Sequence, residues 1–139
     1  MREILFRGKR VDNGEYMPGS YGDWVYGSYG LKLNVATGEH DEYIMESVYN
    51  GATNSSYFVD YKIIPGTAGQ YTGMTDRNGN KIFEGDVVNE DDYTGENGEI
   101  VWDSVELEWA IKIENIEQKL GSYYSTELEI MDNIHDKEE

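Results

Sequence analysis

The strongest constraint on the fold is an Asn78-Gly79 dipeptide that lies between two strand-like segments in residues 69–88, GQYTGMTDRNGNKIFEGDVV. Asn-Gly in this setting is typical of a β-hairpin, because a two-residue primed turn needs a positive φ at both central positions. A second reversal is expected at Glu84-Gly85-Asp86, directly before two β-branched valines. Further Asn-Gly dipeptides stand at residues 13–14, 50–51 and 97–98. Reversals at this spacing predict an antiparallel β protein.

Apolar and polar side chains alternate along several short segments, as in strands with one buried and one wet face. The alternation is clearest over residues 57–63 and 107–113. Further strands are expected at residues 3–7, 24–29, 43–49, 87–88, 99–102 and 127–130. The predicted fold class is therefore mainly β, a small antiparallel barrel or sandwich with an SH3-like barrel element around the EGDVV turn and one or two short helices.

Two segments have weak helix signals. Residues 114–120 contain helix formers and end before Gly121, which suits a helix C-cap. Residues 41–48 begin with an aspartate that suits an N-cap, but their aromatic and β-branched content favours a strand equally. The first segment is predicted to be a short helix, and the choice for the second stays open.

The segment at residues 69–88 resembles the signature of the YopX family of phage and prophage proteins. Residues 1–10 and 128–136 resemble the family's opening and closing segments, although Met131 and His135 depart from the closing pattern. The resemblance implies one YopX-like β-rich domain over residues 1–139, with a frayed tail at 132–139. The signature positions, expected to serve as structural turns, are Gly69, Gln70, Tyr71, Thr72, Gly73, Asp76, Asn78, Gly79, Glu84, Gly85 and Asp86.

Composition narrows the classes of function. The chain has 28 acidic and 11 basic residues, a net charge of −17, so direct binding to nucleic-acid phosphates is not expected and a basic protein partner is favoured. The absence of cysteine excludes disulfides, thiolate zinc sites and cysteine nucleophiles. No apolar run approaches the ~18 residues of a membrane span, and no signal peptide is recognised. We therefore expect a cytoplasmic protein of a bacterial host cell.

No arrangement of residues indicates catalysis, a cofactor or a metal. His40 and His135 are the only histidines, and neither belongs to a nucleophile motif. Asp76 and the two asparagines after it resemble the start of a calcium loop, but Lys81 and Val87 occupy the positions that need glycine and an acidic ligand. We predict a protein that is not an enzyme.

Aromatic residues interleaved with glycine are the remaining signal, since tyrosine and tryptophan dominate binding hot spots. Tyr21, Trp24 and Tyr26 are the predicted partner-binding residues, although the same residues would also suit the core of a small β domain. Homo-oligomers are also conceivable, because short β domains often pair their open edges.

Three hypotheses of function follow. The first is a non-enzymatic phage accessory protein that binds another protein. The second is an acidic mimic of nucleic acid that occupies a host DNA-binding protein, and the third is an undiscovered carboxylate- or metal-dependent enzyme.

Overall fold

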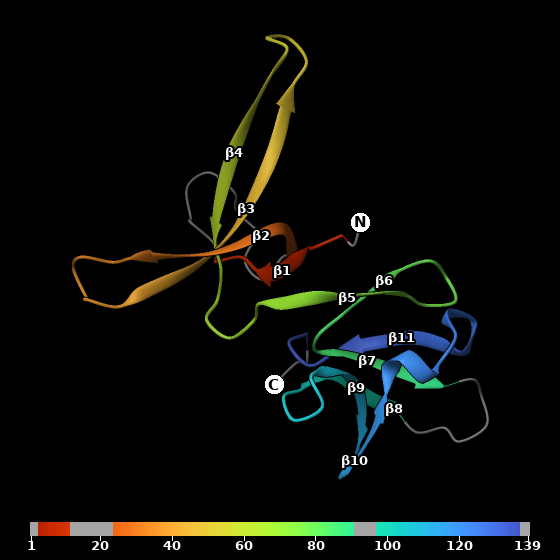
Figure 1. Cartoon of the computed structure of the whole chain (residues 1–139). Coiled ribbons are helices and arrows are strands. Elements are labelled where there is room, and N and C mark those ends of the chain that lie inside the picture. The colour runs from red at the N-terminus through yellow and green to blue at the C-terminus, as the bar shows by residue number, and fades with distance from the viewer. Residues whose placement is uncertain (1–2, 12–23, 91–96, 137–139) are drawn as a thin grey trace. The chain divides into compact units, whose positions relative to one another are not determined.

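The computed structural model describes residues 3–11, 24–90 and 97–136, which are mainly β-structure (Figure 1). Contacts divide the chain into two compact units. The N-terminal unit is Ile4–Gln70, and the C-terminal unit is Tyr71–Glu139 together with Met1–Glu3. The prediction of a single domain with a frayed tail stays a prediction.

The N-terminal unit is an antiparallel sheet. Its strands pair in the order β4-β3-β2-β1, followed by the first residues of β5. Their bounds are β1 (Phe6–Lys9), β2 (Trp24–Leu33), β3 (His40–Asn50), β4 (Ser55–Lys62) and β5 (Gly69–Thr75). Val25, Ile44 and Ile63 form the buried core, because period-two alternation brings these side chains to one face.

The outer part of β3 and β4 forms a two-stranded ribbon. β2 pairs with β3 only as far as Ser28 opposite Met45, whereas β3 and β4 remain paired to Asn50 opposite Ser55. Residues 46–59, which we call the β3–β4 arm, therefore have no third strand beside them. Figure 1 shows the arm as the two yellow-green strands that run on together to a turn.

The C-terminal unit contains a five-stranded antiparallel sheet in the order β10-β9-β8-β7-β11, and a hairpin between the rest of β5 and β6. The element bounds are β6 (Lys81–Phe83), β7 (Asp86–Glu90), β8 (Asn97–Asp103), β9 (Glu108–Ile113), β10 (Ile116–Lys119), η1 (Leu120–Ser122), η2 (Ser125–Glu127) and β11 (Leu128–Asn133). Its buried core contains Ile82, Val88, Ile100, Ile111, Leu120 and Leu128.

The mainly β, antiparallel fold class is confirmed. The two orders of pairing are open in the described residues, so closure into a barrel is wrong, and the SH3-like detail around residues 84–88 is not confirmed. The helical structure of these residues consists of two 3-10 helices, η1 and η2, of three residues each.

The helix predicted at residues 114–120 is wrong. Glu114 has a φ of 57° in a tight turn, after which Ile116 pairs with Ile113 and the chain continues as β10. Residues 41–48 lie in β3, where pairing with β2 and β4 on both sides overrides the capping signal of Asp41. Within the described residues, no helix is long and apolar enough to cross a bilayer.

Two of the Asn-Gly dipeptides behave differently from the prediction. β5 and β6 last pair at Thr75 opposite Lys81, so the turn spans residues 76–80, and Gly79 has a positive φ (81°) whereas Asn78 does not. A two-residue primed turn is therefore wrong there. Asn97 and Gly98 are the first two residues of β8, so the chain does not reverse at this dipeptide. Asn13-Gly14 lies outside the described residues.

Candidate functional site

Asp76 of the signature is a buried hydrogen-bond acceptor at the β5–β6 turn. Its side chain is 3% exposed, and one carboxylate oxygen accepts hydrogen bonds from the backbone N–H groups of Asn78 and Asn80, both at 2.9 Å. The other oxygen accepts one from the N–H of Ile130 in β11 at 3.0 Å. This carboxylate both shapes the turn and attaches it to the five-stranded sheet.

Gly85 and Asp86 connect three further segments of the C-terminal unit. Gly85 has a φ of 90°, donates to the carbonyl of Ile100 at 2.9 Å and accepts from the N–H of Ile134 at 2.9 Å. Asp86 is 1% exposed, and its carboxylate accepts from the N–H of Phe83 at 2.7 Å. Such contacts fix the chain at the start of β7.

The first five signature residues, Gly69, Gln70, Tyr71, Thr72 and Gly73, lie in β5. The Thr72 hydroxyl donates to the Ile82 carbonyl at 2.9 Å and accepts from the Met74 N–H at 3.2 Å. The register between β5 and β6 shifts beyond Tyr71. In the described part of the chain, no three histidine, aspartate or glutamate side chains lie close enough together to hold a metal ion.

Trp24 and Tyr26, two of the predicted partner-binding residues, lie on the same face of β2, and Tyr21 lies outside the described residues. The Arg7 guanidinium lies 4.3 Å from the centre of the Trp24 ring, while Tyr26 is 45% exposed. Tyr29 points to the opposite face and packs on the core. Partner binding by Trp24 and Tyr26 stays a prediction.

Burial and a hydrogen bond to Glu42 raise the pKa of the Tyr29 hydroxyl above its usual value. The hydroxyl donates to Glu42 Oε1 at 3.0 Å. Glu42 Oε2 accepts a hydrogen bond from the Gly66 N–H at 3.2 Å. Tyr29 and Glu42 therefore hold the loop after β4 to the sheet of the N-terminal unit.

Sequence reasoning missed the most exposed aromatic residues among those that the structure describes in the N-terminal unit. Phe58, Tyr49 and Tyr57 of the β3–β4 arm are 76%, 63% and 50% exposed. Alternation places Tyr57 on the face of Val59 and Ile63, but it does not reveal that the sheet narrows to two strands there. A signal was present, because no charged residue occurs between Glu46 and Asp60.

Charge is distributed unevenly between the two units. Ile4–Gln70 contains eight acidic and five basic residues, a net charge of −3, whereas Tyr71–Glu139 contains 19 acidic and five basic residues, a net charge of −14. Most of the acidity of the chain therefore belongs to the C-terminal unit.

Within that unit, the carboxylates gather on one face of the five-stranded sheet. Ile100 and Ile111 pair across β8 and β9 and point into the core, so their neighbours in sequence point to the opposite face. We call this opposite face, with the turn after β8, the acidic face. The charged residues that line the hollows of this face are Glu99, Asp103, Glu106, Glu108, Glu117, Asp132, Lys112 and Lys119.

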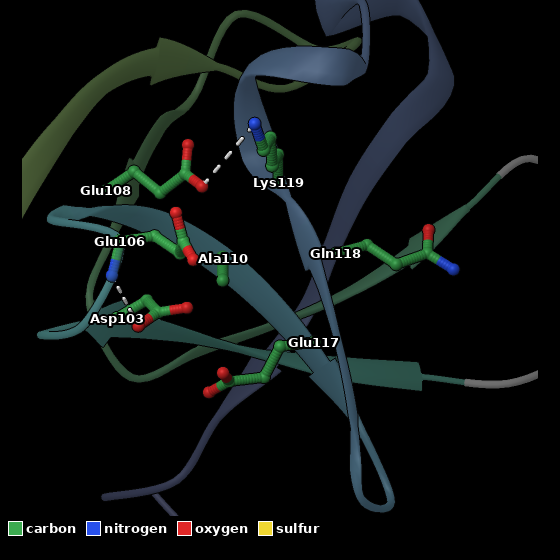
Figure 2. Close-up of a pocket in the computed structure, with 7 residues that line it drawn as sticks. All are labelled: Asp103, Glu106, Glu108, Ala110, Glu117, Gln118 and Lys119. Carbon is green, nitrogen blue, oxygen red and sulfur yellow. Dashed lines mark hydrogen bonds and ion pairs between the residues drawn. The ribbon is translucent and has the colours of Figure 1, made fainter.

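Two open hollows lie on the acidic face. The first has a volume of about 320 Å³ and is lined by Asp103, Glu106, Glu108, Ala110, Glu117, Gln118 and Lys119 (Figure 2). In Figure 2 the Glu108 carboxylate turns toward Lys119, whose Nζ lies 3.9 Å from Glu108 Oε1. Asp103 accepts the backbone N–H of Glu106 at 3.1 Å. The second hollow, about 370 Å³, is lined by Val87, Asn97, Glu99, Lys112, Asp132 and Ile134.

A family model described as YopX protein matches residues 6–139. The chain belongs to the YopX family. The match covers nearly the whole chain and confirms the resemblance of the signature segment. No curated protein matches the chain.

In this YopX chain, the signature and the surface features lie in different places. Asp76, Gly85 and Asp86 make backbone hydrogen bonds that hold the C-terminal unit together. The β3–β4 arm and the charged residues of the acidic face lie outside the signature segment, residues 69–88. The acidic face and the β3–β4 arm are therefore the candidate binding surfaces.

Proposed function

We propose that this YopX-family protein is a non-enzymatic phage or prophage accessory protein that binds a basic protein surface through its acidic face. The supporting observation is the bias of that face, whose hollows are lined by six carboxylates and two lysines, while Ile100 and Ile111 of the same sheet point into the core. Complementary charge steers a basic partner to such a face and disfavours acidic competitors.

The geometry suits the basic side chains of a protein. The two hollows are open and lie between carboxylates, so a lysine or arginine of the partner can reach an acidic group while keeping part of its hydration. Lys119 forms an exposed ion pair with Glu108, with Nζ 3.9 Å from Oε1. Because exposed ion pairs contribute only roughly 0–1 kcal/mol to stability, a cationic side chain of the partner can replace Lys119 beside Glu108.

Mimicry of nucleic acid is a narrower form of this proposal. One row of paired residues crosses the whole sheet, and its members are Glu117, Lys112, Glu99, Val87 and Asp132. Adjacent strands are about 4.8 Å apart, so a carboxylate on every strand would repeat at that spacing. Lys112 and Val87 occupy two of the five positions and interrupt the series of carboxylates. Because a phosphate backbone has no such interruptions, we favour a basic protein surface in general over a DNA-binding cleft.

The hypothesis of a carboxylate- or metal-dependent enzyme finds no supporting observation in residues 3–11, 24–90 and 97–136. An enzyme of this kind needs convergent acidic groups in an enclosed pocket. Here the four acidic residues of the first hollow line an open surface, and the Glu108 carboxylate is turned toward Lys119.

The test is capture of proteins from bacterial lysate on three immobilised forms of the protein. The face variant carries Glu99→Gln and Glu117→Gln. The control carries Glu39→Gln and Glu114→Gln, which remove the same charge from an exposed turn of each unit. At about 0.5–1 kcal/mol per lost ion pair, the face variant should retain a stoichiometric partner roughly tenfold less well, and the control within about twofold of wild type.

Added duplex DNA separates the two forms of the proposal, because it displaces a DNA-binding partner and leaves other basic partners bound. Equal losses for the face variant and the control would mean that net charge alone attracts the partner, and the proposal would then be wrong. Failure of wild type to retain any stoichiometric partner would also contradict it.

A further inference from the structure

The β3–β4 arm offers an unprotected strand edge. β4 lies at the end of the pairing order. The carbonyl of its last residue, Lys62, accepts a hydrogen bond from the Val11 N–H, and the outer side of residues 55–61 has no strand beside it among the described residues. Edge strands are usually protected by lysine, proline or a bulge. Between residues 55 and 59, β4 has no charged residue and no proline, and its register with β3 is continuous.

Apolar side chains cover both faces of the arm. Tyr57 pairs with Val48 on one face, whereas Phe58 and Tyr49 lie on the other face. Phe58 is 76% exposed and Tyr49 is 63% exposed. A two-stranded ribbon is marginally stable by itself, so the arm gains stability if a further strand pairs with it and covers these rings.

We propose that β4 pairs with β4 of a second copy of this chain, antiparallel and centred on Tyr57, to form a symmetric dimer. In this register Ser55 lies opposite Val59 of the other copy, and Ser56 lies opposite Phe58. Small residues thus face large residues on either side of the central Tyr57 pair. The arm already contains this arrangement, because Ser47 pairs with Phe58 and Ser56 pairs with Tyr49.

The same register extends the apolar rows of the arm across four strands. Val48 and Tyr57 of one copy and Tyr57 and Val48 of the other lie side by side on one face, since directly opposite residues point to the same side of a sheet. Cross-strand pairs of aromatic and β-branched residues are among the favourable ones. A symmetric contact uses one patch twice, and this patch is complementary to itself.

Charge also favours a second copy at this position. Two molecules of net charge −17 repel each other at most contacts, but the arm is uncharged between Glu46 and Asp60. Asp60 stands three residues from the centre, so the two Asp60 side chains lie at opposite ends of the contact, about 20 Å apart at about 3.4 Å per residue. That distance exceeds the screening length of about 8 Å at physiological salt. This dimer does not depend on the proposed role of the acidic face.

Sedimentation over a range of protein concentrations tests the dimer. Wild type should change from monomer to dimer as its concentration rises. Tyr57→Lys places like charges opposite each other on the two-fold axis and should weaken the dimer by at least about tenfold. Val105→Lys makes the same charge change at a side chain that is 86% exposed in the C-terminal unit, and it should have less than about a twofold effect.

A mixture tests the register and guards against misfolded variants. Tyr57→Lys and Tyr57→Glu should each be monomeric alone, and a mixture of the two should form a mixed dimer. The introduced lysine and glutamate face each other across the contact only if position 57 lies on the two-fold axis. Tyr57→Cys provides a second check in a chain without cysteine. Opposite residues of antiparallel strands have Cα atoms about 4.5–5.5 Å apart, which a disulfide spans, so this variant should cross-link under mild oxidation and Val105→Cys should not.

Three results would overturn the dimer. The first is a wild type that stays monomeric up to ~1 mM, because a dissociation constant of ~1 mM corresponds to only about 4 kcal/mol of association free energy. The second is a dimer that tolerates Tyr57→Lys, since its interface would then lie elsewhere. The third is a monomeric wild type whose Tyr57→Cys variant cross-links only to a different protein, which would assign the edge to a partner strand.

Discussion

Replacing Asp76 by alanine should destabilise the protein by about 3 kcal/mol. The variant leaves the N–H groups of Asn78, Asn80 and Ile130 without their acceptor. Hydrogen bonds to a charged acceptor are worth about 1.5–3 kcal/mol. We count the partly buried Ile130 N–H at about 2 kcal/mol, and the two N–H groups of the exposed turn at about 0.5 kcal/mol each, because water replaces the lost acceptor there.

Urea unfolding, followed by the fluorescence of Trp102 and Trp109, measures this loss in the C-terminal unit. The two indole rings lie 5.0 Å apart at 73°, so their environment changes when β8 and β9 separate. With an m-value of about 2 kcal/mol per molar urea, the midpoint should fall by roughly 1.5 M.

Asp103→Ala is the matched control for Asp76→Ala. The Asp103 carboxylate also accepts two backbone N–H bonds, from Val105 at 2.9 Å and Glu106 at 3.1 Å, but in an exposed turn. Its loss should cost less than about 1 kcal/mol, because water satisfies both donors. Equal costs for the two variants, or a cost below about 1 kcal/mol for Asp76→Ala, would refute the reasoning that burial of the Ile130 bond sets the magnitude.

Two other substitutions test the packing and the pH dependence. Gly98→Ala would place a Cβ 2.3 Å from Ile111 Cγ2 and should cost about 1–3 kcal/mol in urea unfolding, whereas Gly121→Ala meets no atom within 4 Å and should be nearly neutral. Because the folded-state pKa of Tyr29 is raised by burial and by Glu42, its contribution to stability is complete below pH ~10 and is lost as the pH rises through the folded-state value. Unfolding free energies measured from pH 8 to 11 should therefore fall more steeply for wild type than for Tyr29→Phe, and parallel curves would contradict this interpretation.

Strands were predictable because their signal is local and periodic. The alternation over residues 57–63 corresponds to most of β4, and the alternation over residues 107–113 corresponds to β9. The start of β9 was not predictable, since Leu107 has a φ of 58° in the turn before it and is exposed in spite of its apolar side chain. Period-two patterns assign side chains to faces, whereas the end of a strand depends on where its partner ends.

The failed predictions at residues 97–98 and 114–120 have a common physical cause, which is that strand pairing outweighs the local preference of the chain. Gly98 resembles a turn residue in Asn97-Gly98, but it lies in a strand where the Ile111 side chain occupies the space that a Cβ would need. Residues 114–120 have helix propensity, but pairing of Ile116 with Ile113 satisfies their backbone as strand. Local turn and helix preferences are small, about 1 kcal/mol or less per residue, so pairing overrides them.

The sequence features that identify the family and those proposed to bind partners have different physical roles. Asp76 and Asp86 are at most 3% exposed and bind backbone groups of the same unit, so any replacement there acts first on stability. Glu99 and Tyr57 lie on surfaces where substitution changes charge or apolar area without removing a core contact. Substitutions in the signature should therefore change the free energy of unfolding, whereas substitutions on the acidic face and the β3–β4 arm should change the two proposed binding events and leave that free energy nearly unchanged.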